Sequence, residues 1–525
     1  MPEYLSPGVY IEEIEIGAKP IEGVATSTAA FLGATERGPL QPRLVTSWIE
    51  YTRWFGGFRV PPDEAPDESL PMAVRAFFDN GGQRVYVTRI VKAPVDGASI
   101  TALAEIGGIQ YRASGSGSWG NRVFLRFAPA GSGDPNRFRL LVYYWDRDIE
   151  PANAYPAIAG DRAERAAQPQ PVLIEDFDDL DLRPASTNFV EKRVEASALV
   201  RPHITGALAM PAVDPTVLLP LIGGTDGALP LVASDYDGQG AGAPPLDASW
   251  GLTALAEPPF EDVAIVYAPR GFEDEALRSK LVIHCENNKY RFLIVDAPAN
   301  QSDPGTLNPR SALDSKYVGF YYPWYWTAHP VSSRIIKVAP GGAVAGIFAR
   351  SDVERGVWKA PANETVRGAL ELEFDITKAQ QDVLNPRGVN VIRAFPGRGI
   401  RLWGARTLSS DPLWKYVNVR RLFIFLEASI YRGTQWVVFE PNNEALWARV
   451  KQTVEQFLRT QWRAGALMGL KEEQAFFVKV DRTTMTQDDI DNGRLIVVIG
   501  VSPVKPAEFV IFRFAQFTAP ASANA

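Results

Sequence analysis

Cysteine and histidine are the scarcest chemically reactive residues in this chain of 525 residues. The single cysteine, Cys285, excludes an intramolecular disulfide, as is typical of proteins that fold in a reducing cytoplasm. The three histidines, His203, His284 and His329, have no metal-ligand spacing such as HExxH. These residues therefore indicate neither a metal centre nor a nucleophile–base pair, and we expect Cys285 to be a buried, inert thiol at the end of a helix.

The sequence also lacks the common catalytic and cofactor motifs. The glycine-rich stretch Gly238–Pro244 is not followed by Lys-Ser/Thr, so it is interpreted as a flexible loop and not as a phosphate-binding loop. No GxSxG nucleophile motif is present. Phe395–Gly399, FPGRG, has the composition of a tight turn between strands. We expect no catalytic residue, no cofactor and no metal ligand.

Four aspartates form an acidic cluster between residues 176 and 181. Asp176, Asp178, Asp179 and Asp181 lack the glycine and the distal glutamate of a calcium-binding EF-hand loop. The residues 176–182 are therefore predicted to form a solvated acidic loop.

Long hydrophobic runs are absent as well. The longest apolar stretches, such as Leu495–Val501, have the length of a strand and are too short to cross a bilayer. The first ten residues, MPEYLSPGVY, have neither the basic nor the apolar region of a secretory signal. The sequence therefore predicts no membrane insertion.

Charge is distributed unevenly along the chain. The net charge of −7 argues against direct binding to nucleic acid. Between Arg387 and Arg463, however, thirteen Lys and Arg residues stand against five Asp and Glu residues, a local balance of +8. A basic block inside an acidic protein favours one face that meets an acidic partner.

Buried strands alternate with helices in two separate parts of the chain, which predicts an α/β domain with a parallel sheet covered on both faces. The predicted strands lie in Ser27–Leu40, Arg84–Val91, Val263–Pro269 and Ser315–Trp326, and the predicted helices are Ser69–Gly82, Phe272–Asn288 and Gly342–Val357. Residues 100–220 interrupt the alternation and are rich in Gly, Ala, Pro and Asp, with two β-rich pieces, NRVFLRFAP and NRFRLLVYYW. They are interpreted as an inserted, mostly-β domain.

The aromatic and arginine-rich stretch Asn385–Trp447 is interpreted as a scaffold around which the rest of the chain is organised. A long apolar helix is predicted over Asn418–Tyr431, and a second helix over Asn443–Arg463. On a helical wheel, one face of the second helix is apolar, with Leu446, Trp447, Val450, Val454, Phe457 and Leu458. The opposite face carries Arg449, Gln452, Gln456, Arg459 and Arg463. This second face is either an ordinary solvated surface or a docking face for an acidic partner.

Both ends of the chain contain strand-like segments. Val9–Ile16 has a β-type pattern but no neighbouring strand, and Ala507–Phe517 is long and apolar for a terminal strand. Such segments favour strand addition to a second subunit. The residues that would take part are Val9, Tyr10, Ile11, Ile14, Phe509, Ile511, Phe512 and Phe514.

Ten short motifs cover most of the chain outside residues 100–220. They are SPGVYIEE, TSTAAFLGATERGP, FFDNGGQRVYVTRI, LIGGTDG, ALDSKYVGFYYPW, ARSDVERGVWKAPAN, LNPRGVNVIRAFPGRGIRLWGARTLSSD, WKYVNVRRL, VFEPNNEALW and PAEFVIF. In this order, the motifs resemble the tail sheath proteins of contractile phage tails and related injection systems. Each motif alone is weak, but their joint occurrence in this order is specific.

The resemblance implies an α/β and α+β multidomain fold in four parts. Residues 1–20 would be an N-terminal arm, residues 21–99 and 221–357 a subtilisin-like α/β middle domain without a working triad, residues 100–220 an outer insertion, and residues 358–525 an inner, tube-facing domain with a C-terminal arm. The arms would exchange strands between subunits.

The resemblance further implies a structural protein, not an enzyme. Its subunits would be assembled in the bacterial cytoplasm into stacked rings around an inner tube, and they would also bind baseplate and terminal cap proteins. The metastable extended sheath would shorten on triggering and drive the tube into a target envelope. The alternatives are a static shell or tube component and, more remotely, a subtilisin-like hydrolase.

Overall fold

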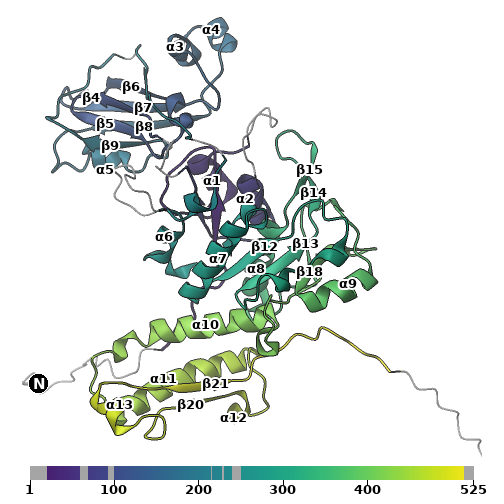
Figure 1. Ribbon diagram of the computed structural model, residues 1–525. Coiled ribbons are helices and arrows are strands. Elements are labelled where there is room, and N and C mark those ends of the chain that lie inside the picture. The colour runs from purple at the N-terminus through teal and green to yellow at the C-terminus, as the bar shows by residue number, and fades with distance from the viewer. Residues whose placement is uncertain are drawn as a thin grey trace, which may run out of the picture.

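The computed structural model describes residues 20–58, 69–92, 100–214, 216–227, 230–238 and 250–513. These residues form three bodies in a row: an inserted β domain at one end, a central α/β domain, and a helical unit at the other end (Figure 1). The described part of the chain therefore has the multidomain α/β and α+β architecture that the sequence predicts.

A nine-stranded sheet forms the centre of the molecule, and six of its strands are parallel. Its order is β16 (Glu364–Thr365), β19 (Gly399–Leu402), β18 (Val389–Phe395), β13 (Val318–Tyr322), β12 (Phe292–Asp296), β11 (Ile265–Tyr267), β1 (Ala29–Gly33), β3 (Val85–Arg89) and β2 (Arg43–Val45). Every residue of β1, β11, β12 and β13 is buried. This continuous burial arises because helices cover both faces of the sheet, which confirms the predicted parallel sheet.

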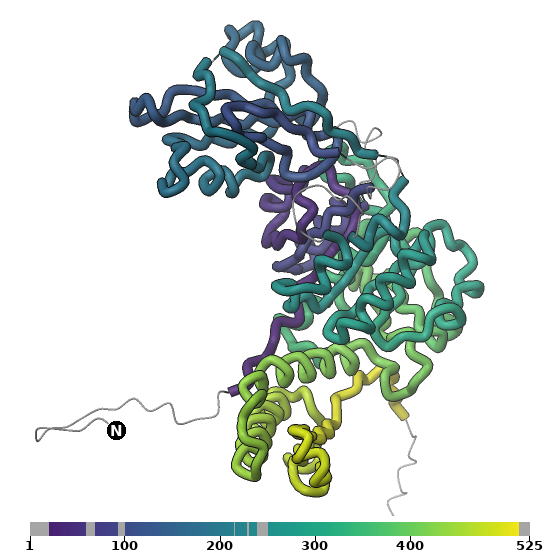
Figure 2. The backbone as a smooth tube through the Cα atoms, turned by 60° about the vertical axis from the view of Figure 1, so that its left-hand side comes forward, coloured from purple at the N-terminus to yellow at the C-terminus, as the bar shows by residue number. Residues whose placement is uncertain are grey.

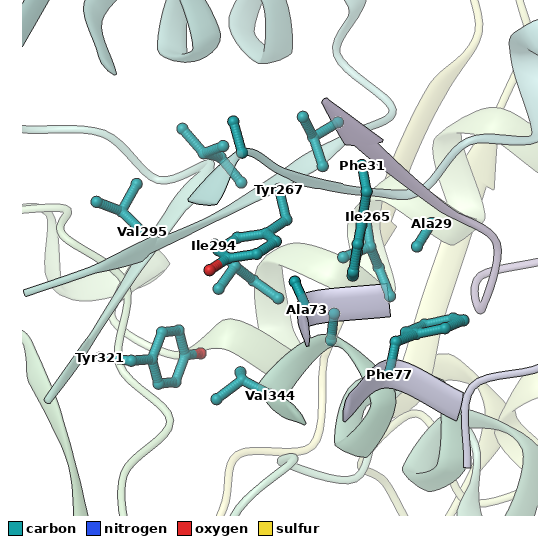
Figure 3. Packing of buried hydrophobic residues seen from close by; sticks show 14 of the residues in the cluster. Ala29, Phe31, Ala73, Phe77, Ile265, Tyr267, Ile294, Val295, Tyr321 and Val344 are labelled. Atoms are coloured by element: carbon teal, nitrogen blue, oxygen red, sulfur yellow. The ribbon is translucent and has the colours of Figure 1, made fainter. Parts of the chain in front are cut away.

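The helices of the central domain pack closely on this sheet. They are α1 (Trp48–Phe55), α2 (Ser69–Asp79), α6 (Gly251–Ala256), α7 (Glu275–Asn288), α8 (Gly341–Arg355) and α9 (Lys378–Leu384). Phe31 lies between Phe77 of α2 and Tyr267, with ring centroids 5.4 and 5.2 Å away (Figure 3). Gly342 brings α8 so close to α2 that an added Cβ would lie 2.5 Å from the carbonyl oxygen of Ala73.

One predicted strand is two strands in the structure. Within Ser315–Trp326, β13 ends at Tyr322, and β14 (Tyr325–Ala328) belongs to a separate sheet with β15 (Ile335–Val338) and β17 (Glu371–Leu372). Pro323 separates the two strands because proline has no N–H group to donate to a sheet.

The inserted residues form two antiparallel sheets with their own hydrophobic core. One sheet contains β4 (Leu103–Ile106), β5 (Ile109–Ala113) and β9 (Val200–Ile204), and the other contains β6 (Val123–Pro129), β7 (Phe138–Tyr144), β8 (Leu173–Leu180) and β10 (Leu219–Pro220). Three helices accompany them, α3 (Pro151–Ala159), α4 (Arg162–Ala167) and α5 (Val190–Val194). Reciprocal backbone hydrogen bonds of 2.9 and 3.1 Å join Ile100 to Thr225, so the two ends of the insertion meet.

The prediction of an acidic loop over residues 176–182 is wrong, because most of it belongs to strand β8. Asp176 accepts a hydrogen bond of 2.8 Å from Nε of Arg139 on β7. Asp178 accepts one of 2.9 Å from the backbone N–H of Gly131 in the turn before β7. The aspartates therefore bind partners across the sheet, and Leu180 fills its core.

The helical unit follows the central sheet. It contains α10 (Val417–Gly433), α11 (Glu444–Arg463), α12 (Glu472–Ala475), α13 (Gln487–Asp491) and the antiparallel pair β20 (Phe476–Lys479) and β21 (Val498–Val501). Both long helices occur where the sequence predicts them, and the Asn443 side chain caps α11. The turn predicted at Phe395–Gly399 also forms, between β18 and β19.

The predicted domain boundary after residue 357 needs correction. Strand β18 pairs in parallel with β13, and β19 pairs with β18, so both extend the central sheet. The core of the helical unit is formed mainly by residues from Leu422 onward. Apolar composition alone does not separate these strands from the helices that follow, because only the pairing with β13 assigns them to the central domain.

Candidate assembly surface

The junction between the central domain and the helical unit is built on a buried ion pair. Arg421 on α10 donates hydrogen bonds of 2.9 and 2.7 Å to the two carboxylate oxygens of Asp352 on α8, and one of 2.8 Å to the backbone oxygen of Thr26. Both charged side chains are 3% exposed. Burial raises the pKa of Asp352, and the charge and hydrogen bonds of Arg421 oppose that shift. One guanidinium therefore ties together three segments that are distant in sequence.

The neighbouring residue Arg420 also faces inward. Its guanidinium lies 4.9 Å from the ring centroid of Tyr317 and 4.7 Å from that of Trp414, and it donates a hydrogen bond of 2.7 Å to Glu427. Flat stacking of arginine on aromatic rings is favourable and needs little hydration of the cation. The arginines of α10 thus connect the two units.

Several residues of the basic block bind other parts of the same chain. Arg406 binds Glu508, and Arg398 and Arg401 bind Asn363. Asp352 and Glu508 cannot be recognised as partners from the sequence, because they lie 69 and 102 residues from Arg421 and Arg406, respectively. The local surplus of +8 is therefore a poor measure of the charge on the outer surface.

Helix α11 separates an apolar face from a polar face. All six predicted apolar residues are buried in the core of the helical unit. On the polar face, Arg449 donates to Glu440 at 2.9 Å and Arg459 binds both carboxylate oxygens of Glu472 at 2.7 Å. Gln452, Gln456 and Arg463 are exposed. The five residues thus lie on one face, but two of its three positive charges are paired with acids of the same chain.

The segment after β21 leaves the core of the helical unit and reaches the central domain, where Glu508 binds Arg406 (Figure 2). Residues 507–513 form no strand in the single chain, so the strand predicted over Ala507–Phe517 is absent from its described part. Phe509, Ile511 and Phe512 are 71, 76 and 78% exposed. The arm residues Val9, Tyr10, Ile11, Ile14 and Phe514, and most of the glycine-rich stretch Gly238–Pro244, lie outside the described residues.

The pKa values and contacts of the histidines and the cysteine follow from their local structure. Burial, and after it the charge of Arg291, lowers the pKa of His284 to about 3. Nδ1 of His329 accepts hydrogen bonds from the backbone N–H groups of Val331 and Ser332 within a turn, whereas His203 is exposed on β9. Cys285 is buried in α7 as expected, and burial raises its pKa to about 12.

Within the described ranges, His, Cys, Asp and Glu nowhere gather in groups of three that would hold a metal ion. In that same part of the chain, no helix has both the length and the apolar character needed to cross a membrane.

Two family models match successive parts of the chain. The phage tail sheath protein central domain matches residues 241–408, and the phage tail sheath C-terminal domain matches residues 409–517. Together they cover just over half of the 525 residues. Their common boundary falls after β19 and before α10, in agreement with the corrected division of the structure.

Curated relatives include the tail sheath protein of Vibrio phage KVP40, which is 27% identical over 37% of this chain and 28% of its own length. A putative prophage major tail sheath protein of Pseudomonas aeruginosa (strain UCBPP-PA14) is 27% identical over 42% of this chain and 56% of its own length. The matched regions thus span from about a quarter to a little over half of these relatives.

Solved structures match the whole fold. The sheath complex of an extracellular contractile injection system, PVC, in its contracted state has a TM-score of 0.58 at 24% identity and covers 98% of this chain and 99% of its own. The contracted helical sheath of the anti-feeding prophage has a TM-score of 0.55 at 24% identity and covers 97 and 99%.

Proposed function

Since this chain belongs to the phage tail sheath family, we propose that it is the subunit of a contractile sheath. The subunits assemble as stacked rings around an inner tube, on a baseplate and below a terminal cap. The observation that carries this proposal is the exposed apolar segment Phe509–Phe512, which has no strand partner among the described residues of its own chain. An unpaired apolar segment promotes aggregation of a monomer, whereas in a polymer it can add as a strand to the sheet of a neighbouring subunit.

The proposed assembly links each subunit to its neighbours by strand exchange through both terminal segments. Backbone hydrogen bonds then connect the subunits while their packing changes. The buried Arg421–Asp352 pair favours the central domain and the helical unit moving together, so that rotation occurs mainly between subunits. A small free-energy preference of each subunit for the contracted packing is multiplied along the polymer, and no nucleotide hydrolysis is needed.

The exposed face of α11 is proposed to meet the tube. It is a broad polar surface on a rigid helix, and its apolar side is fixed in a core. Because Arg449 and Arg459 are already paired, Gln452, Gln456 and Arg463 are the side chains left to make most of the new contacts.

The central domain is proposed to be a subtilisin-like fold that has lost catalysis and serves as a rigid block. Its parallel sheet supports this assignment, as do the structural surroundings of His284 and His329. Labelling of the chain by a serine-directed covalent probe would favour the hydrolase instead. Particles of constant length and width after triggering would favour a static shell.

Two truncations test the assembly proposal. Removal of residues 509–525 should abolish polymers in electron microscopy and leave a soluble chain, because the exchanged strand is lost. Removal of residues 514–525 is the matched control, since it keeps the exposed segment, and should retain some assembly. Sheaths of normal length from the first variant would refute strand exchange at this end.

A further inference from the structure

We propose that Glu508 is a positioning residue. Its contacts with Arg406, Asn385 and Tyr416, called the clamp below, fix the point and direction from which the C-terminal segment reaches a second copy of this chain. The inference rests on the proposed sheath function and adds to it a specific anchor. In this arrangement, tension in the exchanged strand passes into the central sheet of the subunit and not into the helical unit that precedes the segment in sequence.

The Glu508 carboxylate is held by four side chains. Arg406 donates to both of its oxygens at 2.7 Å, Asn385 donates at 2.9 Å and the Tyr416 hydroxyl at 3.1 Å. The ammonium group of Lys415 lies 3.6 Å away. A paired, two-point contact between guanidinium and carboxylate fixes orientation as well as distance.

The clamp is connected to the central sheet. The Arg406 side chain is 8% exposed and also donates to the backbone oxygen of Asn385 at 2.9 Å. The backbone of Arg406 exchanges hydrogen bonds of 2.6 and 2.8 Å with the side chain of Asn390, a residue of β18. Force on Glu508 therefore acts on β18, an interior strand of the central sheet.

A second contact guides the chain toward the clamp. The backbone N–H of Val504 donates to Ala466 at 3.2 Å, and its carbonyl oxygen accepts from the Asn418 side chain at 3.2 Å. Val504 is thus attached to the helical unit, and Glu508 is attached to the central domain four residues later. These two points define the path of the segment.

The exposed fraction of the side chains rises sharply immediately after Glu508. The Glu508 side chain is 20% exposed, whereas Phe509, immediately after it, is 71% exposed. No other charged residue lies between Glu508 and Arg513. The clamp therefore marks the root of the apolar arm.

An anchored root favours assembly through entropy. A tether that starts from a fixed point samples a smaller volume, so the effective concentration of its strand near the neighbouring subunit rises. Loss of the clamp lets the arm swing from Val504, four residues earlier, and lowers that concentration.

The ionisation state of Glu508 agrees with this role. Burial opposes its charge, but the hydrogen bonds from Arg406 and Asn385 and the charge of Arg406 outweigh that effect and lower the pKa of Glu508 to about 2. The carboxylate is charged under all conditions in which the particle would assemble.

The position of the arm can be measured on the unassembled full chain. Because Cys285 is buried, spin labels can be placed at Phe512→Cys and at exposed Ser279→Cys on α7. Pulsed electron paramagnetic resonance should give a narrow distribution of distances between the two spin labels in the otherwise unchanged chain. Glu508→Ala should at least double its width, whereas Asp79→Ala, which removes an exposed ion pair with Arg75, should not change it.

A second variant controls for the arginine that Glu508→Ala leaves without its partner. In Arg406→Met/Glu508→Met both charges are absent, and this variant should show the same broad distribution. A distribution as narrow as the parent's in both variants would overturn the proposal.

Assembly provides the second readout. Glu508→Ala should raise the concentration needed for polymer formation about tenfold, which is ~1.4 kcal/mol, while Asp79→Ala should not. Polymers at the parent's concentration from both clamp variants would also overturn the role of Glu508. If the parent itself formed no polymer but showed the narrow distribution, the sheath function would be wrong and the anchoring of the segment correct.

Discussion

At the residue scale, arginine joins the parts of this molecule. Arg421, Arg420 and Arg406 are each buried. Arg421 and Arg406 bind carboxylates far away in sequence, whereas Arg420 binds Glu427 on its own helix and lies against the aromatic rings of Tyr317 and Trp414. Guanidinium groups suit this task because they hold several acceptors in fixed directions and stay charged when buried. Removal of one partner is costly because the other charge remains buried.

Replacement of Arg421 tests this view. Arg421→Ala should lower the free energy of unfolding in urea by about 3–5 kcal/mol, because Asp352 would be left buried and unpaired. Arg449→Ala, which removes an exposed pair with Glu440, should cost at most about 1 kcal/mol. Equal effects of the two substitutions would mean that the junction does not depend on the buried pair.

The buried carboxyl of Asp296 gives a pH dependence. Burial raises its pKa to about 7, against hydrogen bonds from Tyr267 and the backbone of Gly341. Between its ordinary value near 4 and pH 7 the folded state therefore binds more protons than the unfolded state, so stability falls as pH rises through this window. Asp296→Asn removes the titrating group. The stability of the variant relative to the parent should increase from pH 4 to pH 7 in urea unfolding, and a constant difference would contradict the assignment.

At the scale of single elements, α11 shows how one helix serves two purposes. Its apolar face fills the core of the helical unit, and its outer face is available for contact. The ion pairs of Arg449 and Arg459 lie on this face and reduce its net charge. The positive character of the exposed face therefore depends strongly on Arg463.

A single charge reversal tests the tube-facing assignment. Arg463→Glu should reduce co-sedimentation with tubes by a factor of about two to five, as expected for an exposed charge worth ~0.5–1 kcal/mol. Arg75→Glu makes the same change of charge on α2 and should have no effect. Weaker sheath–sheath contact with unchanged tube binding would assign the face to subunit packing.

At the scale of the whole molecule, the insertion is both self-contained and attached. Its core is separate, and its ends meet at Ile100 and Thr225. Polar contacts also dock it on the central domain: Tyr144 donates to Glu36, and Arg89 of β3 donates to the backbone oxygen of Ser116 at 2.7 Å. The insertion thus extends from the central domain at the end opposite the helical unit (Figure 1).

Excision tests whether the insertion is dispensable. Residues 100–226 expressed alone should unfold cooperatively, because they contain a complete core. The rest of the chain, closed by a short Gly-Ser linker, should still polymerise, since α11 and the C-terminal segment are retained. A remainder that folds but forms no sheath would show that the insertion takes part in subunit contacts.

The amino-acid sequence by itself determined the local elements and the type of fold. Continuous apolar runs predicted the buried strands of the parallel sheet, and the apolar stripe from Leu446 to Leu458 predicted the buried face of α11. The order of short motifs also indicated the sheath family. These features depend on neighbouring residues or on the order of the chain, and both can be read along it.

Only the tertiary structure decided which distant residues meet. It assigned β18 to the central sheet, turned an expected acidic loop into β8, and paired Arg421 with Asp352 and Arg406 with Glu508. Charge counted along the sequence predicted an outer basic surface, whereas several of those arginines are paired with acids of the same chain, and Arg406 and Arg421 among them are buried. The reason is physical: an ion pair depends on distance in space, and packing brings together residues whose separation in sequence gives no signal.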